Sequence, residues 1–93
     1  MKKYIAIGHW SEIKDITSVA CESSNMKNFR DTLGGNCFIP YVIFTEERFR
    51  NLETMSNDEI WEMIKKMTTN YRKWNDIYEY IKQCYEIMYR KFN

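Results

Sequence analysis

Apolar residues recur at alternating steps of three and four through the last quarter of the chain, from Asn70 to Phe92. This spacing is typical of an amphipathic helix, and such a helix would span about 35 Å at 1.5 Å per residue. The stripe consists of Tyr71, Trp74, Tyr78, Ile81, Tyr85, Met88 and Phe92. We expect this helix to lie against a sheet and to turn most of its aromatic side chains inward.

Three earlier segments have the alternation or the β-branched content of strands. Lys3–Trp10 alternates with apolar groups on both sides, and Asp15–Glu22 is rich in β-branched residues. The polar Ser11–Lys14 between them is short enough for an antiparallel hairpin. Asn36–Phe44 is the most strand-like run and contains the only proline. Because Pro40 has no N–H to donate, we expect this third strand at a sheet edge or with a bulge.

Helix-start and helix-stop signals separate these segments. Ser23–Asn25 offers N-cap residues for a short helix, and Gly34–Gly35 would end it because glycine accepts the left-handed conformation. Thr45, followed by two glutamates, starts a second helix. Ser56 and Glu59 fit a capping box ahead of a third. These signals therefore predict three helices in addition to the amphipathic stripe at the C-terminal end.

The order of the expected elements, β-β-α-β followed by helices, predicts an α+β fold. We expect one domain over residues 1–93, with a small three-stranded antiparallel or mixed sheet covered by the C-terminal helices, the last of them long. Thr68–Asn70 are weak helix formers, so residues 57–92 could form two helices or one kinked helix. Seven Tyr, five Phe and three Trp supply the apolar area that so short a chain needs for a core.

Charge and cysteine content narrow the function classes. The 14 Lys and Arg residues nearly balance the 13 Asp and Glu residues, which gives no overall attraction to nucleic acid or to an anionic membrane. The three cysteines are widely spaced, and with a single histidine they form no zinc set and no cofactor motif. We find no signal peptide pattern and no apolar run of membrane-spanning length. These features predict a cytoplasmic protein with reduced thiols.

Catalytic candidates are few. His9 is the only histidine, and the strand pattern puts it on one side with Ile5 and Ile7, which predicts a partly buried structural residue. Cys21 or Cys37 could serve with it as a nucleophile, but no base or positive field stands near either in the sequence. Small buried hydrophobic residues are the better interpretation of these cysteines. The sequence therefore predicts a protein that is not an enzyme.

Basic and aromatic residues interleave where the terminal helix begins. Such interleaving is found in proteins that bind single strands, so a nucleic-acid-binding function is one alternative. In the competing interpretation, Tyr71 and Trp74 face the core and the basic side chains are solvated. The residues of the nucleic-acid alternative are Lys65, Lys66, Tyr71, Arg72 and Lys73.

Two tyrosines, Tyr80 and Tyr89, fall beside the main stripe of the terminal helix rather than within it. Tyrosine and arginine are enriched where proteins meet, so we predict these two tyrosines, Arg72 and Arg90 as contacts for a protein partner. The heptad-like spacing also fits a coiled-coil seam, which leaves a homodimer through the terminal helix as a further alternative.

Three segments, YIAIGHW, LGGNCFIPYVIFTEERF and NYRKWNDIYEYIKQCYEIM, resemble those of small accessory proteins carried by phages and mobile elements of Gram-positive gut bacteria. The resemblance implies a compact protein of the anti-CRISPR or other anti-defence type, which acts by occupying a surface of a host machine. It carries over no functional residue. Together with the missing catalytic set, it predicts a non-enzymatic protein-binding module.

Overall fold

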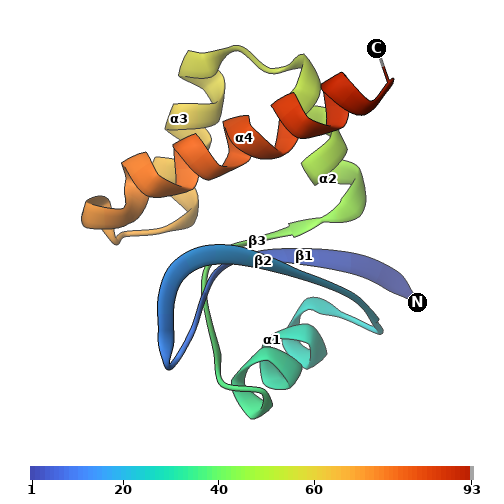
Figure 1. Cartoon of the computed structure of the whole chain (residues 1–93). Helices are drawn as coiled ribbons and strands as arrows, with labels where there is room; N and C mark the ends of the chain where they lie inside the picture. The colour runs from blue at the N-terminus through green and yellow to red at the C-terminus, as the bar shows by residue number, and fades with distance from the viewer. Residues whose placement is uncertain (93) are drawn as a thin grey trace.

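The computed structural model describes the backbone of residues 1–92 and the side chains of residues 1–84. Helix α1 covers one face of a three-stranded sheet, and α2, α3 and α4 cover the other (Figure 1). In chain order the elements are β1 (Lys2–Trp10), β2 (Ile13–Ser23), α1 (Met26–Gly35), β3 (Phe38–Thr45), α2 (Glu46–Asn51), η1 (Leu52–Thr54), α3 (Asn57–Met67), η2 (Tyr71–Lys73) and α4 (Trp74–Phe92). The predicted α+β class and the long C-terminal helix are confirmed.

The sheet is antiparallel throughout, with strand order β2-β1-β3. The predicted hairpin is present, but its turn is shorter than expected, because β2 already begins at Ile13. Pro40 lies in an edge strand and next to a register shift, so both interpretations of this proline are confirmed. An edge position leaves the missing N–H of proline without consequence for the sheet.

At the register shift between β1 and β3, β3 has one residue more than β1. Ile7 pairs with Val42 and Gly8 pairs with Pro40, so Tyr41 has no partner on β1. A bulge of this kind can turn a side chain toward a face where regular alternation would not put it. The Tyr41 ring packs against the core under the C-terminal helices, with its centroid 5.6 Å from that of His9.

Two cores lie on opposite faces of the sheet, because alternate side chains of β1 point to opposite sides. The core between the sheet and the C-terminal helices consists of Ile7, Val42, Phe44, Leu52, Ile60, Met63, Ile64, Ile77 and Ile81. The core between the sheet and α1 consists of Tyr4, Ala6, Phe29, Leu33, Phe38 and Ile43. The prediction that the terminal helix lies against the sheet is confirmed by Ile77 and Ile81, which are both fully buried.

The predicted helix starts are confirmed by their capping bonds. The side chain of Asn25 accepts a bond of 2.8 Å from the N–H of Asn28, and that of Thr45 accepts one of 3.2 Å from Arg48. Ser56 and Glu59 form both bonds of the capping box, each 3.2 Å long. Each bond satisfies a backbone donor that the first helical turn leaves free.

The predicted end of α1 is wrong in its detail. The helix runs through Gly34 and Gly35, and neither glycine has a positive φ. The left-handed residue is Cys37, with φ 62°. The N–H of Asn36 bonds to the carbonyls of Thr32 and Leu33, which tightens the last turn and shifts the reversal of the chain to Cys37.

Residues 57–92 form two helices rather than one kinked helix. The helix α3 ends at Met67, and Thr68–Asn70 and the short η2 separate it from α4. The expectation that the aromatic stripe faces inward holds for Trp74 and Tyr78, which pack against the core, but it is wrong for Tyr71, whose surface is 65% exposed. The side chains of Tyr85, Met88 and Phe92 lie outside the described residues.

Candidate interaction surface

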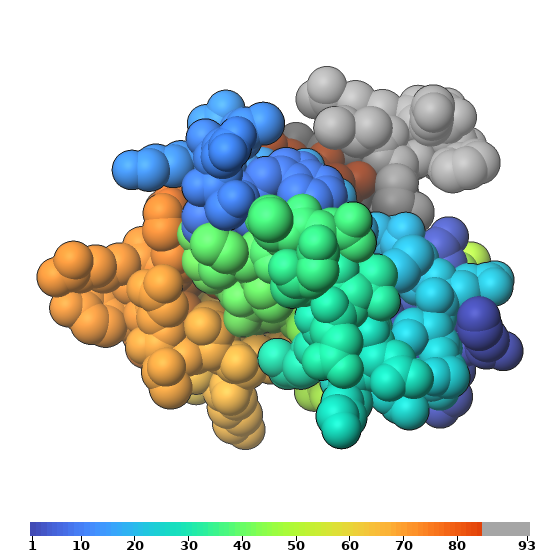
Figure 2. Space-filling model, turned by 90° about the horizontal axis from the view of Figure 1, so that it is seen from below, coloured from blue at the N-terminus to red at the C-terminus, as the bar shows by residue number. Residues whose placement is uncertain are grey.

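The connection between α3 and α4 is held in place by its own hydrogen bonds. The indole Nε1 of Trp74 donates to the carbonyl oxygen of Thr68 over 3.0 Å. The N–H of Tyr71 bonds to the carbonyl of Thr69, and that of Lys73 bonds to the carbonyl of Asn70. The segment near residue 70, orange in Figure 2, projects from one end of the molecule close to the blue hairpin turn. This end therefore presents its side chains from a fixed backbone.

Cations lie over several aromatic rings at this end. The Lys65 ammonium is 5.7 Å from the Trp61 ring and 5.9 Å from the Trp74 ring. The Arg72 guanidinium is 5.9 Å from the ring of the exposed Tyr71. Such contacts restrict long side chains that would otherwise be mobile in water. We call Tyr71 and Arg72 the α3–α4 end.

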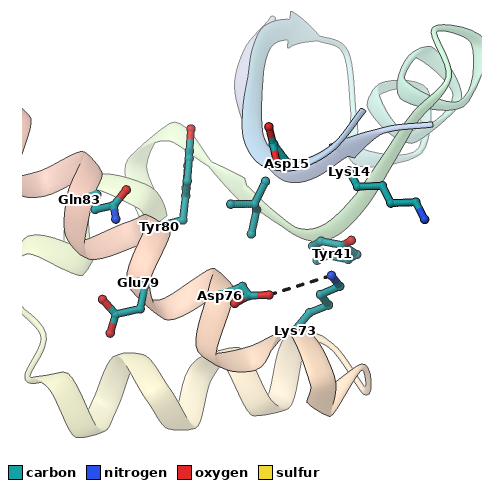
Figure 3. A pocket seen from close by; sticks show the side chains of 9 residues that line it. Lys14, Asp15, Tyr41, Lys73, Asp76, Glu79, Tyr80 and Gln83 are labelled. Carbon is teal, nitrogen blue, oxygen red and sulfur yellow. Dashed lines mark ion pairs between the residues drawn. The ribbon is translucent and has the colours of Figure 1, made fainter. Parts of the chain in front are cut away.

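A groove of about 330 Å³ lies beside this end, between α4, the start of β2 and the bulge of β3 (Figure 3). Lys73 bridges the two sides, because it lies 4.0 Å from Asp76 on α4 and 5.9 Å from the Tyr41 ring on β3. The residues that line the groove are Lys14, Asp15, Ile16, Tyr41, Lys73, Asp76, Glu79, Tyr80 and Gln83. They include basic and acidic residues, so the groove can accept polar groups of either charge.

The residues predicted to contact a protein partner do not lie together in the structure. Arg72 is exposed at the α3–α4 end. Tyr80 is half-buried at the groove, and its hydroxyl lies 3.0 Å from the hydroxyl of Ser18 on β2. The side chains of Tyr89 and Arg90 lie outside the described residues. The structure thus separates Arg72 from Tyr80 by the start of α4.

The residues of the nucleic-acid alternative lie on the last turn of α3 and on η2, and two of the four cations form ion pairs with acidic residues. Lys65 lies 3.3 Å from Glu62, and Lys73 lies near Asp76. Among residues 1–84, no ion pair involves Lys66 or Arg72. The net positive charge around these residues is therefore smaller than the sequence alone indicates.

His9 and Cys21, one of the pairs that the sequence left open, lie on opposite faces of the sheet. The Nδ1 atom of His9 is 2.7 Å from the carbonyl oxygen of Trp10, and the ring is partly buried beside Tyr41. Cys21 packs on the opposite face of the sheet, against the core of α1. His9 and Cys21 therefore cannot act together as a base and a nucleophile. Cys37 is not a buried residue, contrary to our expectation; it is exposed after α1.

No cluster of three or more His, Cys, Asp or Glu side chains that could hold a metal ion occurs in the described part of the chain. None of its helices has the length and apolar character needed to cross a membrane. No protein family, curated protein or solved structure matches the chain.

Sequence reasoning missed the part of this surface that comes from the strands. Tyr41, Lys14 and Asp15 meet α4 at the groove, although they lie more than thirty residues before Asp76 in the chain. The available signal was Pro40, because a proline in a strand indicates a bulge and a bulge redirects the next side chain. The stripe pattern gave no indication that Tyr71 would be exposed.

Proposed function

We propose that this chain is a non-enzymatic protein-binding module that acts by occupying a surface of another protein, and that the α3–α4 end makes the contact. The observation that supports this proposal is the exposure of Tyr71. Tyr71 is 65% exposed, whereas the other described tyrosines are buried or half-buried. Arg72 lies over the same ring. Tyrosine and arginine are the residues that most often dominate binding energy at protein interfaces.

The fixed backbone of this end favours binding for an energetic reason. A partner that contacts a mobile loop must first order it, and this entropy cost reduces affinity. Here the bond from Trp74 to Thr68 and the turn bonds of Tyr71 and Lys73 already order the connection. The contact between Arg72 and the Tyr71 ring limits the side chains as well.

The charges of the α3–α4 end indicate the chemistry of the partner. Arg72 forms no ion pair among residues 1–84, so a carboxylate-bearing surface would complete it. The resemblance to accessory proteins of phages and mobile elements suggests a host defence protein as the bearer of that surface. An acidic patch on the surface of such a protein is what we propose this end to occupy.

The nucleic-acid alternative uses the same residues and makes a different prediction. Binding to phosphates would weaken steeply as the salt concentration rises. The basic side chains release counterions from the strand when they bind, and this release is less favourable at high salt. The ion pairs of Lys65 and Lys73 reduce the charge available for such binding. Salt-sensitive binding of single strands that disappears when Arg72 and Lys73 are both changed to Ala would support this alternative over a protein partner.

A site-specific photo-crosslink tests the proposal. A photoreactive phenylalanine at position 71 should yield one discrete protein adduct in the host cell, and Arg72→Ala should abolish it. The matched control carries the same group at Thr32, an exposed position on α1 across the sheet. No adduct at position 71, or the same adducts at both positions, would overturn the proposal. An adduct that nuclease removes would establish the nucleic-acid alternative instead.

A further inference from the structure

A second groove, of about 600 Å³, lies between α2 and α3. Its apolar lining consists of Met55, Met63 and Met67. Met63 belongs to the core under the C-terminal helices, and the other two methionines pack against that core, so the floor of the groove is the outer edge of the core. Methionine side chains are flexible and polarisable, and they are common on surfaces that accept varied apolar groups. The groove can therefore bury apolar side chains of another molecule.

The walls of this groove are helical. Arg48 and Asn51 lie on α2, and the lining residues from Asp58 to Met67 lie on α3. The backbone groups inside a helix bond within that helix, so these walls offer no strand edge to an extended peptide. A second helix satisfies its own backbone groups and presents only side chains, and the apolar face of such a helix fits a groove of this kind. The occupant that the walls favour is therefore an amphipathic helix.

The charges on the groove side of α3 are sorted along the helix. Asp58, Glu59 and Glu62 line the groove toward the start of α3, and Lys66 lines it in the last turn. With Arg48 on α2, the lining has two cations against three carboxylates. An occupant would meet opposite charges at both ends of α3 if its positive end lay beside the three acids and its negative end beside the lysine.

This order of charges selects the direction of the occupant. Acids in the first turn and bases in the last turn stabilise a helix, because they oppose its macrodipole. A helix of that kind meets opposite charges along α3 when it lies antiparallel, and like charges when it lies parallel. We propose that the groove between α2 and α3 binds an amphipathic helix of another protein, antiparallel to α3 and with its apolar side chains against the three methionines. This surface is distinct from the α3–α4 end, and the proposal does not depend on that end.

Nuclear magnetic resonance of the methionine methyl groups tests the proposal. The probe is a synthetic helical peptide of about four turns, with leucines along one face, glutamates in its first turn and lysines in its last turn. It should shift the ε-methyl signals of Met55, Met63 and Met67. The signal of Met26, which packs against the core of α1, should stay unchanged. A control peptide with alanine in place of each leucine should shift none of the four signals.

The direction of the bound helix has its own readout. Met55 precedes α3 and Met67 is its last residue, so their methyl groups mark the two ends of the groove. A nitroxide on the last residue of the probe should broaden the Met55 signal more than the Met67 signal. Asp58→Lys should raise the dissociation constant of the probe about fivefold, because an attractive contact becomes a repulsive one. The matched control is Asp31→Lys, an equal change of charge at an exposed position on α1, which should leave the dissociation constant as it is.

The proposal would be overturned if the three groove signals did not shift, if the alanine peptide shifted them equally, or if the nitroxide broadened Met67 more than Met55. Shifts of the same signals with the concentration of the chain alone would also overturn it, in favour of a second copy of this chain as the occupant. These outcomes are separate from those of the photo-crosslink at position 71, because Asp58→Lys leaves the α3–α4 end unaltered.

Discussion

Gly8 lies directly opposite Pro40, and the two backbones approach so closely that no side chain fits between them. A Cβ atom at Gly8 would overlap the carbonyl oxygen of Ile39 and lie 2.8 Å from the Cα atom of Pro40. The glycine has no positive φ, so the requirement is one of space rather than of backbone conformation. The register shift that redirects Tyr41 thus depends on a missing side chain in the neighbouring strand.

Gly8→Ala should therefore lower the free energy of unfolding by about 3 kcal/mol, since the added methyl group forces β1 and β3 apart. Urea denaturation measures this loss. Gly34→Ala is the matched control, because nothing lies within 4 Å of a Cβ at that helical position. It should leave stability unchanged or raise it by up to about 1 kcal/mol. Equal losses in both variants would contradict the close approach at Gly8.

Cys37→Gly should stabilise the fold by about 1 kcal/mol. Cys37 has φ 62°, and a residue with a Cβ atom pays a steric cost in this left-handed region that glycine does not. Thermal denaturation of the two proteins under reducing conditions measures the difference. Cys37→Ala keeps the Cβ atom and should give no gain, so a gain in both variants would mean that the thiol rather than the backbone is responsible.

Ile81→Ala should lower the free energy of unfolding by about 3–4 kcal/mol, because Ile81 is fully buried between α4 and the sheet. The same substitution at Ile13, which is 57% exposed, should change it by less than about 0.5 kcal/mol. Chemical denaturation of both variants gives the comparison. Similar losses at the two positions would mean that α4 does not rest on the sheet.

Stability should fall in alkaline solution partly because of Cys84. Burial raises the pKa of the Cys84 thiol, and a hydrogen bond with Tyr80 opposes this only in part. The folded chain therefore keeps the thiol proton at a pH where the unfolded chain has lost it. The resulting contribution is complete below the ordinary thiol pKa of about 8.5 and is lost as the pH rises through the higher folded value.

The free energy of unfolding should decrease between neutral and alkaline pH. This decrease should be smaller in Cys84→Ser than in the unaltered chain. Cys37→Ser is the control, because Cys37 is exposed and its replacement should leave the decrease as it is. An identical pH dependence in all three proteins would remove Cys84 as a cause.

Local signals made most of the fold predictable. The hairpin, the caps at Asn25 and Thr45, the capping box at Ser56 and the edge position of Pro40 each depend on a few neighbouring residues. The sequence carries such signals directly, because capping and proline effects act within one turn of the backbone. The stripe predicted that α4 packs against the sheet, and it also fitted a coiled-coil seam.

The interaction surface was less predictable, since it depends on where elements begin and how they meet. The stripe assigned Tyr71 to the terminal helix, but α4 begins at Trp74, and Tyr71 belongs to a tighter turn with a different side-chain direction. The groove joins Asp15, Tyr41 and Asp76 from three elements. Pro40 indicates the bulge, but no local pattern specifies which side chains of the other two elements the bulge brings together.

The central strand belongs to both layers of the molecule at once. Tyr4 and Ala6 of β1 are buried under α1, and Ile7 is buried under the C-terminal helices. Neither layer can detach without exposing the strand that supports the other, so heat or denaturant should melt the domain in one cooperative transition. The amide hydrogens of β1 would then exchange with solvent only through global opening, more slowly than those of either edge strand.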